Sequence, residues 1–254
     1  MSITRRVGAT ALILGLSTTL AGCGGGSEGD SGGNESGTTE SAEAGGDFAD
    51  GSPQEIAEAA VKATTSVESL TIAGELTSQG QDIKLDLSLN RDQQCAGTIG
   101  IGEGTAEIIS IPAAAYLKGD AAFWTAAAGK AQAEMMTNLI GDKWLKLPQD
   151  QNQFGDFCDL DSFLDDLSDI QEDNTADKGE VEDINGTEAI ALIEAEEEGE
   201  TIGWIATEPE HYLVRVERTG EESGTVDFTG FNEPVDVTEP AKKDVVDLAA
   251  LQGG

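Results

Sequence analysis

Apolar and polar residues alternate along four successive segments between residues 70 and 111. This period of two is typical of half-buried antiparallel strands, whose side chains point to opposite faces in turn. The apolar members of the four runs are Leu70, Ile72 and Leu76; Ile83, Leu85, Leu87 and Leu89; Cys95, Gly97, Ile99 and Ile101; and Ile109 and Ile111. We therefore predict a meander with one apolar face, which has to be covered by the protein's own core or by a ligand.

A second meander is predicted in the carboxyl-terminal half of the chain. The dipeptide Asn185-Gly186 lies between two apolar runs, and this is the strongest short signal for a β-hairpin. Strands are predicted at 116–118, 143–147, 180–184, 188–193, 201–206, 212–218 and 225–231, with an edge strand at 234–237.

Helices are predicted around the two meanders. Ser52 and Glu55 form a capping box around Pro53, so a helix should begin at residue 53. The alanine-rich stretch 121–139 and the segment 161–170, which has one apolar face, are also predicted as helices. Residues 245–251 are predicted to form a terminal helix or a tail. We therefore predict an α+β fold with about ten strands and two or three helices in one domain.

The amino terminus resembles a bacterial lipoprotein signal peptide. Arg5 and Arg6 precede the apolar segment 7–20, which is too short for a stable membrane anchor, and small residues lead up to Cys23. We predict a signal peptide at 1–22 and lipidation of Cys23, with an ordinary secretory signal or a chance cysteine as the alternative. The residues after the arginine pair fit a twin-arginine signal poorly, so Sec export is preferred.

The segment after Cys23 has the composition of a linker. Residues 24–51 are mainly glycine, serine, threonine and acidic residues with a lone Phe48, and they cannot bury enough apolar area to fold. We predict a tether at 23–51 and a folded domain at 52–254. Cys95 and Cys158 remain in that domain, and an even remainder in an exported chain favours a disulfide over two free thiols.

Charge and motifs exclude several classes of function. Acidic residues outnumber basic ones by 49 to 14, so the net charge is −35 and nucleic acid is excluded as a partner. The single histidine, His211, has no accompanying nucleophile motif, and a packing or surface role is favoured. Zinc would need several histidine or cysteine ligands, and the aspartates between 156 and 169 lack the spacing of a calcium loop. We therefore predict no enzyme activity, no metal site and no cofactor.

Four segments, taken in order, carry a family resemblance. They are Val67-Glu68-Ser69-Leu70; Ala115-Tyr116-Leu117-Lys118-Gly119-Asp120 with Phe123-Trp124; Lys143-Trp144-Leu145-Lys146-Leu147; and 228–237. In this order they resemble the actinobacterial lipoprotein family typified by LppX and LprG, which has a LolA/LolB-like fold. The resemblance implies a strongly curved half-barrel whose concave face, covered by helices, forms an apolar cavity for acyl chains. The cysteine pair and the alanine-rich stretch after Trp124 depart from the family pattern.

The resulting hypothesis is a monomeric lipoprotein at the outer face of the cell membrane, held there through Cys23, that binds and carries the acyl chains of a lipid or lipoglycan. The residues predicted to line its cavity are Ile72, Leu76, Leu85, Leu87, Ile99, Ile101, Met135 and Met136. Plain core packing is the alternative for each of them. A sensor or regulatory module of the cell envelope is the alternative function, and a cell-wall hydrolase is the third hypothesis.

Overall fold

The structure is a computed structural model that describes residues 46–78, 80–147, 158–170, 176–196, 199–220 and 222–252. These residues belong to one compact unit, Ala42–Gly254. The predicted signal peptide, Cys23 and the predicted tether up to residue 45 lie outside the described residues. Within the described ranges, no helix combines the length and the apolar character needed to cross a bilayer.

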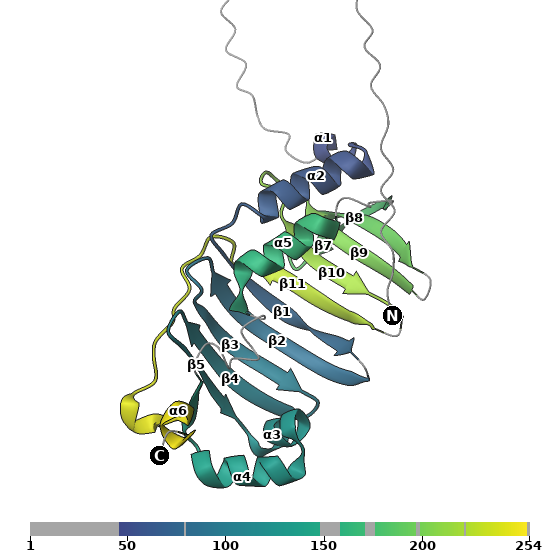
Figure 1. The fold of residues 1–254 in the computed structure, drawn as a ribbon. Helices are drawn as coiled ribbons and strands as arrows, with labels where there is room; N and C mark the ends of the chain where they lie inside the picture. Colours follow the sequence, from purple (N-terminus) through teal and green to yellow (C-terminus); the bar gives the residue numbers. More distant parts are fainter. Residues whose placement is uncertain are drawn as a thin grey trace, which may run out of the picture. The chain divides into compact units, whose positions relative to one another are not determined.

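Twelve strands of the described chain form one curved sheet, which is antiparallel except where β12 pairs with β6 (Figure 1). In spatial order they are β12 (Val245–Asp247), β6 (Trp144–Leu147), β5 (Ala114–Gly119), β4 (Gly104–Ile111), β3 (Cys95–Ile101), β2 (Gln81–Asn90), β1 (Ser69–Ser78), β11 (Gly224–Thr229), β10 (Leu213–Arg218), β9 (Gly199–Ala206), β8 (Thr187–Glu196) and β7 (Asp177–Ile184). The two predicted meanders meet where β1 pairs with β11. The sheet stays open between its edge strands β12 and β7, and with its helices it confirms the predicted α+β fold.

The strand register collects the first three predicted apolar runs on one face of the sheet. The fourth prediction is wrong, because Ile108 of β4 pairs with Gly97 of β3, so Ile109 and Ile111 lie on the opposite face. Ile72 of β1 lies opposite Leu87 of β2 on one side and Phe228 of β11 on the other. Beyond β3 the same row continues through Ile108 of β4 to Leu117 of β5. We call the side that carries these five buried residues the core face. Burying each large side chain stabilises the fold by about 1.5–3 kcal/mol, so this row is a main source of stability.

The helices pack on separate parts of the sheet. They are α1 (Gly46–Ala49), α2 (Pro53–Thr64), α3 (Ala121–Ala128), α4 (Lys130–Ile140), α5 (Leu160–Ile170) and α6 (Leu248–Gln252), with a 3-10 turn, η4, at Lys242–Asp244. The helices α2 and α5 contact each other and lie over the second meander, whereas α3 packs on β3, β4 and β5 (Figure 1). The short carboxyl-terminal helix, α6, contacts β6. The predicted capping box of α2 is confirmed, because the Ser52 amide donates to Glu55 Oε2 at 2.9 Å and the Glu55 amide donates to Ser52 Oγ at 3.3 Å.

Two segments differ from the sequence prediction. The single helix predicted at 121–139 is divided into α3 and α4, because Gly129 between them has a φ of 82°. A positive φ lies outside the helical region and favours glycine, so α3 ends at this residue. The edge strand predicted at 234–237 does not form within this described segment, where Pro234 has no amide hydrogen to offer a strand partner. The edge beyond β6 is instead β12, from the stretch predicted as a terminal helix or tail.

A disulfide holds the amino-terminal end of α5 to the sheet. Cys95, the first residue of β3, is joined to Cys158, and the two Cα atoms are 5.4 Å apart. Both cysteines are buried in the hydrophobic cluster that contains the residues of the core face. The predicted disulfide is therefore present, and it fixes where α5 begins.

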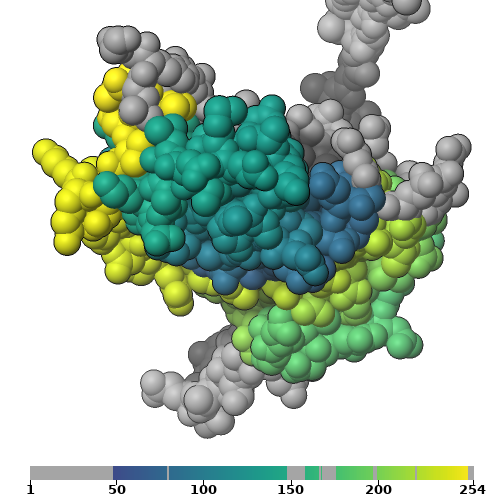
Figure 2. Space-filling model, turned by 90° about the horizontal axis from the view of Figure 1, so that it is seen from below, coloured from purple at the N-terminus to yellow at the C-terminus, as the bar shows by residue number. Residues whose placement is uncertain are grey.

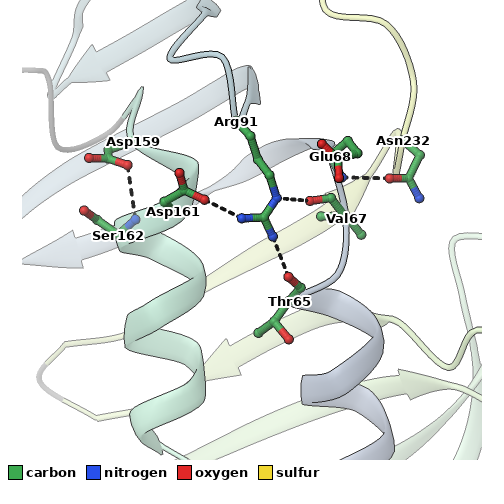
Figure 3. A network of polar contacts seen from close by, with 8 residues as sticks. All are labelled: Thr65, Val67, Glu68, Arg91, Asp159, Asp161, Ser162 and Asn232. Carbon is green, nitrogen blue, oxygen red and sulfur yellow. Dashed lines mark hydrogen bonds and ion pairs between the residues drawn. The ribbon is translucent and has the colours of Figure 1, made fainter.

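Arg91 adds a polar connection between α2 and α5 (Figure 3). Its Nε donates to the carbonyl oxygen of Val67 at 2.8 Å, and one terminal nitrogen donates to the carbonyl oxygen of Thr65. Its other terminal nitrogen pairs with the carboxylate of Asp161 in the first turn of α5. One guanidinium group thus joins the end of α2, the approach to β1 and the start of α5, which keeps the two helices in place over the second meander.

Replacing both Cys95 and Cys158 by alanine should lower the free energy of unfolding by about 4 kcal/mol, because the bond closes a loop with a sequence separation of 63 residues. Urea unfolding of the variant and the wild type, followed by tryptophan fluorescence, measures this difference. The reduced wild type is the control and should lose a comparable amount. Equal stability of the oxidised wild type and the alanine variant would contradict a stabilising role for the disulfide.

Arg91→Ala should lower the free energy of unfolding by about 2–3 kcal/mol, because two carbonyl groups and a carboxylate lose a charged donor that is only partly exposed. Hydrogen exchange should also show lower protection in α5. Arg218→Ala is the matched control: Arg218 pairs with Glu196 and Glu222, but its side chain is 45% exposed against 32% for Arg91. Its loss should cost less than about 1 kcal/mol. Equal costs for the two variants would disprove the connecting role of Arg91.

Candidate functional site

An apolar hollow of about 160 Å³ lies between the α2–α5 pair and the strands β8, β9 and β10. We call it the first hollow. The residues around it are Ala60, Val61, Leu167, Ala176, Leu192, Glu194, Thr201, Gly203, Ile205, Leu213 and Val216. All of them except Glu194 and Thr201 are apolar, so the interior offers an acyl group or a similar apolar ligand a dry environment.

Small residues leave the space that forms the first hollow. Gly203 of β9 lies between Leu192 of β8 and Val216 of β10 on the core face. A Cβ atom added to Gly203 would lie 3.5 Å from its nearest neighbour, a methyl carbon of Leu213, which is an ordinary contact. Ala60 of α2 is similarly short on the opposite wall. The strand therefore leaves a space above Gly203 that a longer side chain would occupy.

A polar rim borders the first hollow. The Thr201 hydroxyl donates to Glu196 Oε1 at 2.6 Å, and Arg218 donates to Glu196 Oε2 at 2.6 Å. These two hydrogen bonds, with that from Thr201 the larger cause, hold the pKa of Glu196 below its ordinary value. The bond to Glu196 in turn raises the pKa of Arg218. The rim thus stays charged near neutral pH. It could contact a polar headgroup or water, whereas the interior could hold the apolar part of a ligand.

A second hollow of about 230 Å³ lies beside the first and shares Val216 with it. Its residues are Leu76, Thr77, Ser78, Val216, Arg218, Glu222, Ser223, Gly224 and Val226. Leu76, Val216 and Val226 all belong to the core face, as the pairing of β1, β11 and β10 shows. The two hollows together follow the core face from β8 to β1.

The predicted lining residues lie in several environments. Ile72, Leu87 and Ile99 are buried in the main core cluster, and Leu85, Ile101 and Met136 are partly buried against it. Leu76 lines the second hollow, whereas Met135 lies exposed on α4. None of the eight borders the first hollow. The predicted lining residues are large and apolar, so they fill space. Gly203 is not among them, although a glycine inside a strand pattern signals open space or a close approach.

His211 has a packing role in the described structure. Its ring stacks on Phe48 of α1 with ring centroids 3.6 Å apart, and its Nδ1 lies 3.1 Å from the carbonyl oxygen of Ala206. Phe48 also packs against the cluster that α2 forms with β8 and β9. In the described part of the chain, no three histidine, cysteine or acidic side chains gather in a way that could hold a metal ion.

One solved structure has a fold similar to that of this chain. No protein-family model matches the sequence, and no curated protein matches it. The structure of LprF from Mycobacterium bovis superposes on this chain with a TM-score of 0.54 at 13% identity, covering 75% of this chain and all of LprF.

Two further solved structures are similar at lower scores. The Mycobacterium tuberculosis lipoprotein LppX gives a TM-score of 0.47 at 14% identity over 73% of this chain and 98% of LppX. A LolA superfamily protein from Nitrosomonas europaea gives 0.23 at 8% identity over 76% of this chain and 96% of its own. At such identities the similarity concerns the fold alone. The chain has the fold of LprF, and the predicted resemblance to LppX/LprG-type lipoproteins is confirmed at the level of the fold.

Proposed function

We propose that this protein is a membrane-anchored lipoprotein of the cell envelope that binds and carries the acyl chains of a lipid or lipoglycan. The observation that carries the proposal is the first hollow, an apolar space on the core face between α2, α5 and the second meander. Its polar rim would leave a headgroup in contact with water, while the interior accepts carbon. No catalytic step is part of the proposal.

The size of the hollow decides how much of a ligand it can hold. A closed apolar cavity of about 150 Å³ is large enough to bind benzene, so the first hollow would take an acyl segment of about six carbons. At about 0.8 kcal/mol per methylene, such a segment contributes about 5 kcal/mol, which alone gives weak binding. A tighter complex needs the second hollow as well, and the shared Val216 makes that extension continuous.

The predicted lining residues enter this proposal in two ways. Leu76 would contact the part of the acyl chain that lies in the second hollow. Leu85, Ile101 and Met136 border the main core and would contact a larger ligand that extends toward β2 and β3. Ile72, Leu87 and Ile99 would then form the floor beneath it.

The proposal places the protein at the outer face of the cell membrane as a monomer. The sequence up to residue 23 supports this, because its signal-like segment ends at Cys23, where a diacylglycerol group would anchor the chain. Most of the segment 23–51 would then act as the tether between the anchor and the folded domain. Its last part, Gly46–Ala49, forms α1 instead and packs on the domain through Phe48. The protein would stay close to the lipids it binds.

The modest size of the first hollow favours one alternative. Typical small-molecule pockets enclose about 300–1,000 Å³, more than this space offers. A non-enzymatic sensor or regulatory module would need to bind only the end of one acyl chain. Transfer of a fluorescent phospholipid between two vesicle populations separates the functions, because a carrier accelerates transfer and a sensor binds without transferring.

Gly203→Leu should weaken the binding of cis-parinaric acid, a fluorescent fatty acid, at least about tenfold, because a loss of two buried methylenes is worth about 1.6 kcal/mol. The added side chain would occupy the first hollow, and Gly203→Ala should have a smaller effect. Fluorescence titration measures affinity, and thermal unfolding checks that the fold remains intact. Thr98→Leu adds the same side chain to the opposite face of the sheet and should leave the affinity unchanged.

Two results would count against the proposal. Wild-type affinity in folded Gly203→Leu would mean that the acyl chain binds elsewhere. If the wild type neither bound the fatty acid nor carried lipid in organic extracts analysed by mass spectrometry after purification from its own host, lipid binding itself would be abandoned.

A further inference from the structure

The segment that contains α3 and α4, drawn in teal, forms a large part of the face seen in Figure 2, and it exposes apolar residues to solvent. Met135 is 67% exposed and Leu139, one helical turn further on, is 51% exposed. They are the most exposed large hydrophobic side chains of the described residues, and Ala128 and Ala131 are exposed on the same pair of helices. We call the surface formed by Ala128, Ala131, Met135 and Leu139 the helical face.

The packing of α3 and α4 keeps the helical face turned outward. Phe123, Trp124, Ala133 and Ile140 are buried on the inner side of the same helices. The indole nitrogen of Trp124 donates to the carbonyl oxygen of Gly119 at 2.9 Å. Because these contacts fix the rotation of both helices, Met135 and Leu139 cannot turn into the core without breaking them.

The helical face is electrically unlike the rest of the protein. Residues 121–143 contain two lysines, Lys130 and Lys143, and two acidic residues, Glu134 and Asp142, so their net charge is zero in a chain of net charge −35. Both lysines are exposed, and neither pairs with a carboxylate among the described residues. Elsewhere, carboxylates would repel an anionic surface, but here that repulsion is locally absent.

The helical face adjoins the rim of the sheet that carries the second hollow. The strand end at Ser78 of β1 pairs with the start of β2, and Ile83 near that start pairs with the last residue of β3, Ile101. The next strand, β4, begins at Gly104, where an added Cβ atom would collide with the backbone of Phe123 in α3. The second hollow, which includes Ser78, and the helices α3 and α4 therefore lie along one row of strand ends.

From these observations we propose that the helical face docks on the headgroup layer of the lipid bilayer. The proposal rests on the anchoring through Cys23 put forward above. A second copy of this chain is the weaker candidate, because two molecules of charge −35 repel each other and a stable protein interface needs about 800 Å² from each partner. A membrane needs less area, since the anchor keeps the local concentration of bilayer high and weak contacts then suffice.

Docking in this orientation would bring the row of strand ends that borders the second hollow close to the lipids. Met135 and Leu139 would enter the boundary between headgroups and acyl chains, and Lys130 and Lys143 would lie at the level of the phosphates. The acidic remainder of the domain would stay in water.

A fluorescent label on the helical face tests the proposal. In Met135→Cys the new residue is the only free thiol, because Cys23 is acylated and Cys95 is bonded to Cys158. The full lipoprotein, labelled there with a nitrobenzoxadiazole dye, is reconstituted into vesicles of phosphatidylcholine with phosphatidylglycerol. We expect a blue-shifted emission that nitroxide-labelled lipids quench. Adding Leu139→Glu should return the emission to its position in water.

The matched control carries the same dye at Val181→Cys. Val181 is 43% exposed on β7, at the other edge of the sheet and among acidic residues, and its emission should stay that of water. A water-like signal at residue 135 in protein that floats with the vesicles would overturn docking alone. A blue shift at residue 135 without vesicles that grows with protein concentration would overturn it in favour of self-association. Failure to float would remove the anchor, and docking would fall with it, whereas fatty-acid binding would be unaffected.

Discussion

The pairing of β1 with two neighbours is the constraint on which the rest of the structure depends. The strand bonds to β2 on one side and to β11 on the other, although β11 follows it by more than a hundred residues. This register places Ile72 between Leu87 and Phe228, so the apolar faces of both meanders become one surface. A shift of one residue would turn every side chain of β1 to the opposite face and separate the two meanders. Both hollows and the positions of α2 and α5 follow from this single alignment.

The sequence predicted the strands better than the site, for a physical reason. Alternation reports burial of large side chains, so Leu70, Leu87 and Ile99 indicated the core correctly. A cavity arises where side chains are small, and Gly203 and Ala60 leave no periodic signal of their own. Which side chains face Gly203 depends on the bulged register between β9 and β10. The sequence of either strand alone does not determine that register. The fold class was thus readable, whereas the location of the first hollow was not.

Single residues explain the local differences. Gly129 is a single glycine in an alanine-rich stretch that was predicted as one helix. Its positive φ divides the stretch into two helices and so creates the exposed side of α4. Phe48 was the one large apolar residue in a polar segment, and in the structure it stacks on His211 and packs near α2. The signal was present in both places. For Phe48 the consequence depended on His211, a partner far away in the sequence. For Gly129 it depended on a backbone angle that the composition of the stretch does not specify.

The use of basic residues connects the fold to the proposed membrane orientation. In a chain with so few cations, Arg91 joins α2 to α5, Arg215 bonds Asp227 across β10 and β11, Lys146 bonds Asp247 across β6 and β12, and Lys178 donates to carbonyl groups at Ala49 and Gly51. Each of them connects two elements of this acidic chain, three through a carboxylate and Lys178 through backbone carbonyl groups. Lys130 and Lys143 make no such connection in the described structure. Both belong to the segment 121–143 that carries the helical face, next to the row of strand ends at the second hollow. An acyl chain that entered there would contact apolar side chains on its way from the bilayer into the protein. The acidic rest of the domain would not have to approach anionic headgroups.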